Sequence, residues 1–168
     1  DGLPDDVGSL YEGDTGYDLV QEPDPDVVRW ITASRWSGTW RFLAFRVSGR
    51  LRGWAMTRSY AGKTGRQGAL VEVFAPRPDA DTYAWMVAEA SRALLRARPT
   101  RILARALCPL LSGALARNRF RHAGVDSPVY SWPAFAPAIP GSMHVTLLHS
   151  DAPILPYDTE PDAPSETS

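Results

Sequence analysis

Residues 69–76 have the sequence ALVEVFAP, in which a nearly unbroken apolar run leads to a proline. An apolar run this short, bounded by a breaker, is typical of a strand that is buried on both faces. Pro76 ends the run because proline cannot donate a ladder hydrogen bond. Glu72 is the one charged residue within it, so we expect a single carboxylate inside a buried strand over residues 69–74.

The segment after this run has the pattern of a helix, a strand and a second helix. Asp81 is the expected N-cap of a helix that extends to about Arg98. This helix is predicted by an apolar stripe at helical spacing, which consists of Tyr83, Met86, Val87, Ala90 and Leu94. Residues 101–107 predict a strand, and residues 110–118, which follow Pro109, predict a further helix.

The segment before the run predicts a helix and a hairpin. Residues 24–34 begin with Asp-Pro-Asp, a favourable helix start, and predict a short helix. Residues 40–47 alternate, with large apolar side chains on both sides, so we expect a strand buried on much of both faces. Residues 51–60 form the expected return strand, and residues 61–68 are expected to be a glycine-rich loop.

Two more strands are expected downstream, over residues 128–132 and 143–149. Three sequential strands that lead into strand–helix–strand units predict a mixed sheet whose first half is antiparallel. The sequence is therefore expected to adopt the α/β (α+β) fold class.

Charge divides the chain into three parts. Residues 1–26 contain nine acidic and no basic residues, and residues 151–168 contain five acidic and no basic residues. All 18 basic residues lie in residues 27–150, against five acidic ones, which gives this part a formal charge of +13. We therefore expect an acidic N-terminal segment, a folded domain over residues 27–150, and an acidic, proline-rich, disordered tail.

The basic middle part would attract anions, such as nucleic acid, a phosphorylated cofactor or the acidic ends of the chain itself. Nucleic acid is the less favoured ligand, because the tryptophans alternate within apparent strands and so are expected to pack in the core. Residues 62–64 read Gly-Lys-Thr, but Thr57 stands where a phosphate-binding loop needs its first glycine.

No apolar run is long enough to span a membrane, and the start of the chain has no visible secretory signal. The sequence also does not begin with an initiator Met, so we expect that it is a piece cut from a longer polypeptide. Cys108 is the single cysteine, so we expect no internal disulfide, no Cys-based zinc site and a cytoplasmic location. His144 and His149 would point to opposite faces of one strand, so no metal site is predicted.

The order of elements over residues 51–132, namely strand, proline, helix, strand, helix, phenylalanine and strand, resembles the GNAT acyltransferase superfamily. Residues 49–54, GRLRGW, are similar to the hairpin of that family, and Phe120 stands where the family usually has the phenylalanine of Gly-Phe. The resemblance implies a mixed central sheet with helices on both faces. It also implies transfer of an acyl group from acetyl-CoA, or another acyl-CoA, to a small-molecule amine.

The resemblance further implies which residues would act. Glu72 matches the carboxylate base on the central strand, where its flanking valines would raise its pKa toward neutrality; the equal alternative is that Glu72 pairs with one of the many arginines. Leu115 occupies the position of the family's tyrosine acid, so Tyr130 on the next strand is the expected substitute. The residues expected to hold the cofactor lie on and after the central strand: Val73, Phe74, Ala75, Arg77, Thr82 and Tyr83.

The turn that would hold the phosphates departs from the family pattern. Residues 77–83, RPDADTY, contain no glycine, and Pro78 lacks a backbone donor. Asp79 and Asp81 add negative charge where phosphates would lie, and Asp81 is expected to cap the helix with its own carboxylate. The alternative is therefore a non-catalytic GNAT-like domain that has lost CoA binding, partnered by a second GNAT-like domain or a second copy of itself. The sequence leaves open whether the domain is an enzyme.

Overall fold

The computed structural model describes residues 2–17, 20–33, 38–62, 65–106 and 108–122. A 3-10 helix, η1 (Val7–Leu10), and helix α1 (Pro25–Ala33) precede the sheet. The remaining elements are β1 (Thr39–Val47), β2 (Arg50–Gly62), β3 (Gly65–Phe74), α2 (Ala80–Leu95), β4 (Arg101–Ala104) and α3 (Pro109–Arg117). The strands predicted over residues 128–132 and 143–149, and the predicted tail, lie outside the described residues.

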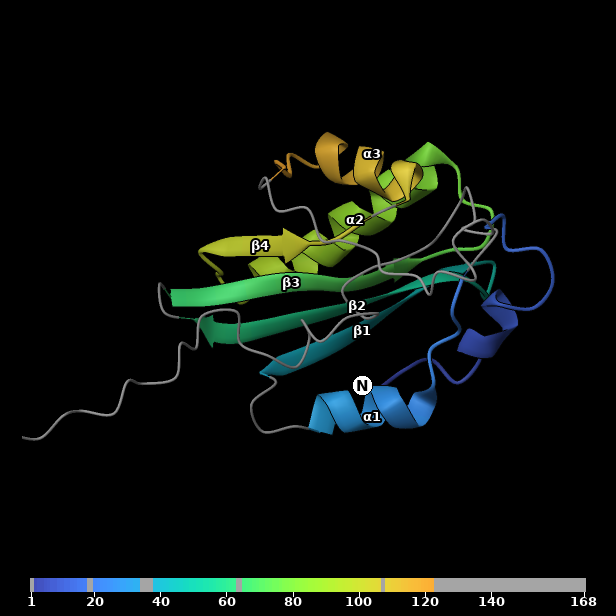
Figure 1. The fold of residues 1–168 in the computed structure, drawn as a ribbon, viewed down its shortest axis with the longest axis horizontal. Coiled ribbons are helices and arrows are strands. Elements are labelled where there is room, and N and C mark those ends of the chain that lie inside the picture. Colours follow the sequence, from blue (N-terminus) through green and yellow to red (C-terminus); the bar gives the residue numbers. More distant parts are fainter. Residues whose placement is uncertain (1, 18–19, 34–37, 63–64, 107, 123–168) are drawn as a thin grey trace, which may run out of the picture.

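The four strands form one sheet in the order β1-β2-β3-β4 (Figure 1). The first two pairs are antiparallel, and β3 pairs with β4 in parallel. The predicted α/β fold class, with a mixed sheet and an antiparallel first half, is confirmed. The connection from β3 through α2 to β4 is the crossover that a parallel pair requires.

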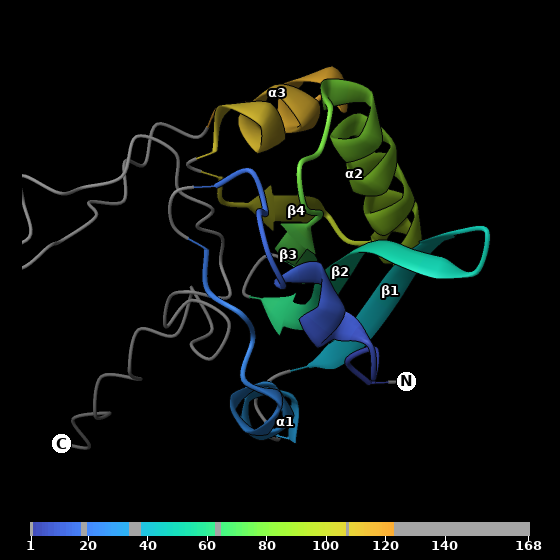
Figure 2. The same cartoon turned by 90° about the vertical axis from the view of Figure 1, so that its right-hand side faces the viewer.

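Helices cover both faces of the sheet, as predicted (Figures 1 and 2). Helices α2 and α3 pack on one face, over a core that includes Val73, Met86 and Leu111. The other face carries η1 and α1, over a core that includes Trp54 and Phe74. Side chains on either face of the central strands therefore pack in one of two apolar cores.

The described residues of the glycine-rich segment, 61–62 and 65–68, belong to strands and not to a loop, which corrects the prediction. β2 continues to Gly62 and β3 begins at Gly65, and these two residues are paired in register. Gly65 has φ +115°, which only glycine adopts readily, and a side chain on Gly62 would collide with Gln67. Glycine at these positions allows the paired strands to pack closely. Several glycines in a short segment are also typical of loops, so the sequence alone predicted a loop.

β1 is also less buried than its pattern predicts. Phe45 is its one buried residue, and the others are exposed or half-buried. Within the described sheet β1 has a single neighbour, β2, so it is an edge strand that the helices cover only in part. Large apolar side chains on both sides of a strand show that the strand is apolar, but they do not show whether it lies at the centre or at the edge of the sheet.

A β-bulge interrupts β3 at Val71. Thr57 of β2 pairs with Leu70, but the preceding residue Met56 pairs with Glu72, so Val71 is the extra residue. The bulge shifts the alternation of side chains: Leu70 and Val73 both enter the core under α2, although they are three residues apart. Burial of the strand on both faces explains its continuous apolar run, and the bulge decides which face each side chain enters.

Helix α2 begins earlier than predicted, because Asp79 and not Asp81 is its N-cap. The Asp79 Oδ1 atom accepts a hydrogen bond from the Thr82 N–H at 2.6 Å. Asp81 lies in the first turn and forms an ion pair with Arg117 of α3, at 2.8 Å. No helix among the described residues is long and apolar enough to cross a membrane.

Two glycine substitutions test this packing with opposite expected signs. A methyl group on Gly53 would lie 2.8 Å from the Phe74 carbonyl oxygen and 2.7 Å from the Met86 methyl group. Gly53→Ala is therefore expected to lower the free energy of unfolding by about 1–3 kcal/mol. A methyl group on Gly113, in helix α3, meets nothing within 4 Å. Gly113→Ala is expected to raise the free energy of unfolding by about 0.5–1 kcal/mol.

Denaturant unfolding of the two variants beside the parent chain measures both changes. Equal midpoints for Gly53→Ala and the parent chain would contradict the close approach of β2, β3 and α2.

Candidate functional site

The parallel strands β3 and β4 separate at the bulge at Val71. Pairing between β3 and β4 runs from Gln67 with Arg101 to Leu70 with Ala104, whereas β3 itself continues to Phe74. A narrow, mostly apolar cavity lies at this separation, lined in part by Val71, Glu72, Val73, Leu111 and Leu115. Beyond Leu70, the β4 side of β3 has no strand partner among the described residues.

Glu72, the predicted base, lies at this point and is 2% exposed. Its Oε1 atom accepts a hydrogen bond from the Val73 N–H at 2.8 Å. The bulge positions this carboxylate, because Glu72 is the first residue after the extra one. A charged group can remain inside a core only where polar groups surround it.

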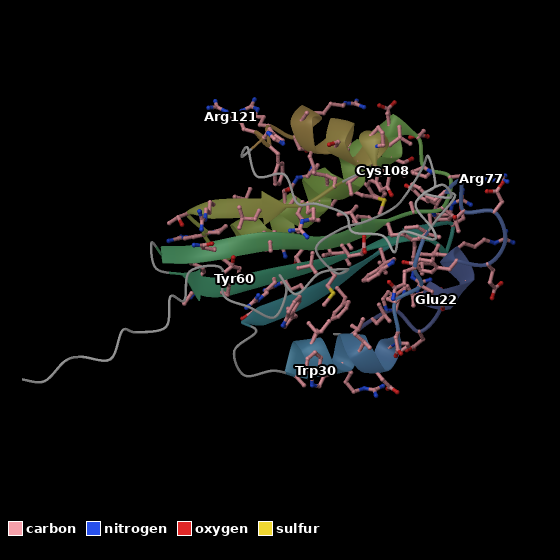
Figure 3. The ribbon with its side chains drawn as sticks, viewed as in Figure 1. Glu22, Trp30, Tyr60, Arg77, Cys108 and Arg121 are labelled. Carbon is pink, nitrogen blue, oxygen red and sulfur yellow. The ribbon has the colours of Figure 1, made fainter. Side chains whose placement is uncertain are left out.

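Tyrosine hydroxyls supply part of that surrounding. The hydroxyl oxygens of Tyr17 and Tyr83 are 2.7 Å apart, and the Cys108 thiol donates to the Tyr17 hydroxyl at 3.8 Å. Cys108 is the N-cap residue of α3 and lies between that helix and the sheet (Figure 3). We call Tyr11, Tyr17, Tyr83, Glu72 and Cys108 the tyrosine cluster.

Burial raises the pKa of Tyr17 and of Tyr83, and the nearby negative charge of Glu72 raises both further. Burial also raises the pKa of Tyr11, and the Glu72 charge adds to that rise. All three hydroxyls therefore keep their protons near neutrality and can act as hydrogen-bond donors. The arrangement is a buried carboxylate beside neutral hydroxyl donors, which is suited to moving a proton.

The N-terminal segment covers the turn that follows β3. The Arg77 N–H donates to the Thr15 carbonyl oxygen at 2.6 Å, and the Arg77 guanidinium forms an ion pair with Asp14. The hydrogen bond from the Arg77 guanidinium, followed by one from the Gly16 N–H, holds the pKa of Asp14 below its usual value. Gly16 packs against Arg77 so closely that a side chain there would lie 3.2 Å from the arginine backbone. The acidic end thus binds the basic middle part, one of the three partners that its charge predicts.

The backbone N–H groups in the first turn of α2 already donate hydrogen bonds to its N-cap residue, Asp79. The Thr82 and Tyr83 N–H groups donate to the side chain and the carbonyl of Asp79, at 2.6 and 3.2 Å. Hydrogen bonds from the backbone and then the side chain of Thr82, with a smaller contribution from the Asp81 N–H, lower the pKa of Asp79. As folded, the turn offers phosphates no free N–H at Arg77, Thr82 or Tyr83, so these residues do not fit a pyrophosphate in this arrangement. At the β4 side of β3 beyond Leu70, the described residues leave only the narrow cavity beside Glu72.

The predicted cofactor residues fall into two groups. Arg77 and Thr82 lie at the surface of the turn, whereas the others are buried: Val73, Phe74, Ala75 and Tyr83. Phe74 stacks on Tyr11, with ring centroids 4.3 Å apart and an angle of 7° between the rings, so its side chain is part of the core. Tyr130, the predicted acid, lies outside the described residues.

Sequence reasoning missed Tyr11, Tyr17 and the hydroxyl of Tyr83 as parts of the site. Tyr83 was predicted as a member of an apolar stripe and as a cofactor residue, but not as a hydroxyl group near Glu72. Tyr17 lies 66 residues before Tyr83, and no local pattern joins the two. Among the described residues, no group of three or more His, Cys, Asp or Glu side chains is arranged to hold a metal ion.

Comparison with known proteins adds evidence on the fold. No family model matches the sequence, and no curated protein matches it. Two structures of TTHA1254 from Thermus thermophilus are similar at 10% identity: a point mutant covers 76% of this chain and 91% of its own, with a TM-score of 0.53. The wild type covers 75% and 90%, with a TM-score of 0.52.

A ribosomal-protein-alanine N-acetyltransferase from Brucella melitensis biovar Abortus 2308 is 20% identical and covers 76% of this chain and 94% of its own, with a TM-score of 0.46. The likeness to TTHA1254 shows that this chain shares that protein's fold.

Proposed function

We propose that this domain transfers an acyl group from acyl-CoA to a small amine, with Glu72 as the base. The observation that carries the proposal is the buried Glu72 carboxylate at the point where β3 leaves β4, beside the Tyr17–Tyr83 hydroxyl pair. An amine must lose a proton to become acylated, and a positioned carboxylate accelerates such a step by about 10²–10⁴-fold.

The residues of this chain divide the work as follows. Glu72 accepts the proton of the amine, and the neutral hydroxyl of Tyr17 would return a proton to the leaving group. The backbone groups of Val73, in the part of β3 that has no β4 partner among the described residues, and of Ala75 just after β3 would receive the extended arm of the acyl donor. Acyl-CoA would supply the activated acyl group. Arg77 would meet a phosphate only after residues 14–17 leave the turn.

A second candidate function is binding without catalysis, with a second GNAT-like domain or a second copy of this chain as the partner. The filled turn favours it, because Asp14 and Asp79 occupy the groups that would hold phosphates. The single cysteine favours the cytoplasm as the location in either case.

Calorimetric titration with acetyl-CoA separates the two functions. Removal of the Asp14 charge should free Arg77, so Asp14→Asn is expected to tighten acetyl-CoA binding by about two- to fivefold, as for other exposed pairs. Asp26→Asn is the matched control, because Asp26 pairs with Arg29 on α1, away from the turn. Absence of binding by all three proteins at millimolar acetyl-CoA would exclude acyl-CoA chemistry by this chain alone and leave the binding function.

Glu72→Gln tests the base directly. The substitution keeps the size of the side chain and removes its ability to accept a proton, so turnover should fall at least about 100-fold while acetyl-CoA affinity is retained. Glu89→Gln on α2 is the control, since Glu89 pairs with Arg92 at the surface and should leave turnover unchanged. Turnover that survives in folded Glu72→Gln, as judged by circular dichroism, would show that Glu72 is not the base.

A further inference from the structure

A second pocket lies beside the turn, on the face of the sheet that α2 covers. It has a volume of about 430 Å³ and is enclosed by the β1–β2 hairpin, residues 75–79 and the first turns of α2. The hairpin and the beginning of α2 lie at the same end of the molecule (Figure 1). Neither Glu72 nor any other member of the tyrosine cluster lines this pocket, which we call the hairpin pocket. Its volume falls in the range of small-molecule sites, about 300–1,000 Å³.

The floor of the hairpin pocket is apolar and aromatic. Phe45 and Trp85 meet edge to face, with ring centroids 5.0 Å apart and an angle of 69° between the rings. Trp85 is 45% exposed and Val47 is 58% exposed, and both line the pocket together with the buried Met86. A tryptophan held in one orientation, and still open to solvent, offers a flat apolar surface to a ligand at low entropic cost.

The rim of the hairpin pocket carries positive charge that nothing in the described structure neutralises. Arg50 and Arg52 of β2 line the pocket and are exposed, and neither has an ion-pair partner among the described residues. The other charged lining groups are occupied, because Arg77 pairs with Asp14 and Asp79 caps α2. The free charge therefore lies on the hairpin side, opposite the turn.

An aromatic floor with free guanidinium groups at its rim selects one class of ligand. Guanidinium groups bind carboxylates and phosphates through paired N–H donors, and the floor favours a flat or aliphatic body. We propose that the hairpin pocket binds a small organic anion, whose carboxylate or phosphate is held by Arg50 and Arg52 and whose apolar body packs on Trp85 and Phe45. The hairpin pocket shares no residue with the tyrosine cluster, whereas Ala75, Arg77 and Thr82 of the predicted cofactor residues line its turn side. The anion is assigned to Arg50, Arg52, Phe45 and Trp85, none of which the proposed acyl transfer uses, so either proposal can fail without the other.

Calorimetry with 1-naphthaleneacetate as the probe tests this site, beside the uncharged 1-naphthaleneacetamide as a matched compound. Saturable binding of the acid at one site is expected, with the amide weaker by about tenfold or more, because a charge-assisted hydrogen bond is lost. 1-Naphthyl phosphate distinguishes the two anion classes: a tighter fit than the acid identifies a phosphate ligand, and a weaker one identifies a carboxylate ligand.

Variants locate the site. Arg50→Ala with Arg52→Ala, and separately Trp85→Ala, are each expected to weaken the acid by about tenfold or more. Arg41→Ala with Arg98→Ala removes the same charge from exposed positions outside the hairpin pocket and should change the affinity by less than about twofold. The proposal is overturned if the parent chain shows no saturable binding at about 10 mM probe, if acid and amide bind equally, or if the control pair weakens the acid as much as the pocket variants do.

Discussion

The bulge at Val71 is the constraint on which the rest of the structure depends. β3 is buried on both faces along most of its length, so its side chains must enter one of two apolar layers. The extra residue reverses the alternation after Leu70, and the pairing with β4 ends at the same residue. A single irregularity therefore determines which core each side chain enters, where the parallel strands separate, and where the Glu72 carboxylate lies.

Charge separation along the chain attaches the N-terminal segment to the domain. Asp6 forms a two-bond ion pair with Arg46 of β1, and Asp14 pairs with Arg77 beyond β3. Between them, Tyr11 stacks on Phe74 and accepts a hydrogen bond from Trp54 at 3.0 Å. The segment is therefore held by ionic contacts at two points and by aromatic burial between them, and it closes the tyrosine cluster on its solvent side.

The sequence predicted most of the fold but only part of the site. Local patterns were sufficient for α1, α2, α3 and the four strands, because apolar periodicity and proline positions are local signals. Local patterns were insufficient for the glycine-rich segment, where glycines allow close packing between strands. They were also insufficient for the N-cap of α2, because Asp79 and Asp81 are both suitable cap residues and only the folded geometry shows that Asp79 is the cap. Glu72 stood out as the one charge in an apolar run, whereas Tyr17 joins the site through contacts across 66 and 91 residues, which no local pattern encodes.

Cys108 gives the chain a built-in reporter of its own opening. It is the only cysteine in the sequence, it is buried, and its thiol hydrogen is directed at the Tyr17 hydroxyl. A thiol reagent can reach this sulfur only when the chain around it opens, and two exposed ion pairs, which salt screens, help to attach the segment that carries Tyr17. The rate of Cys108 alkylation at increasing ionic strength therefore measures how often that segment detaches from the domain, and no engineered cysteine is needed.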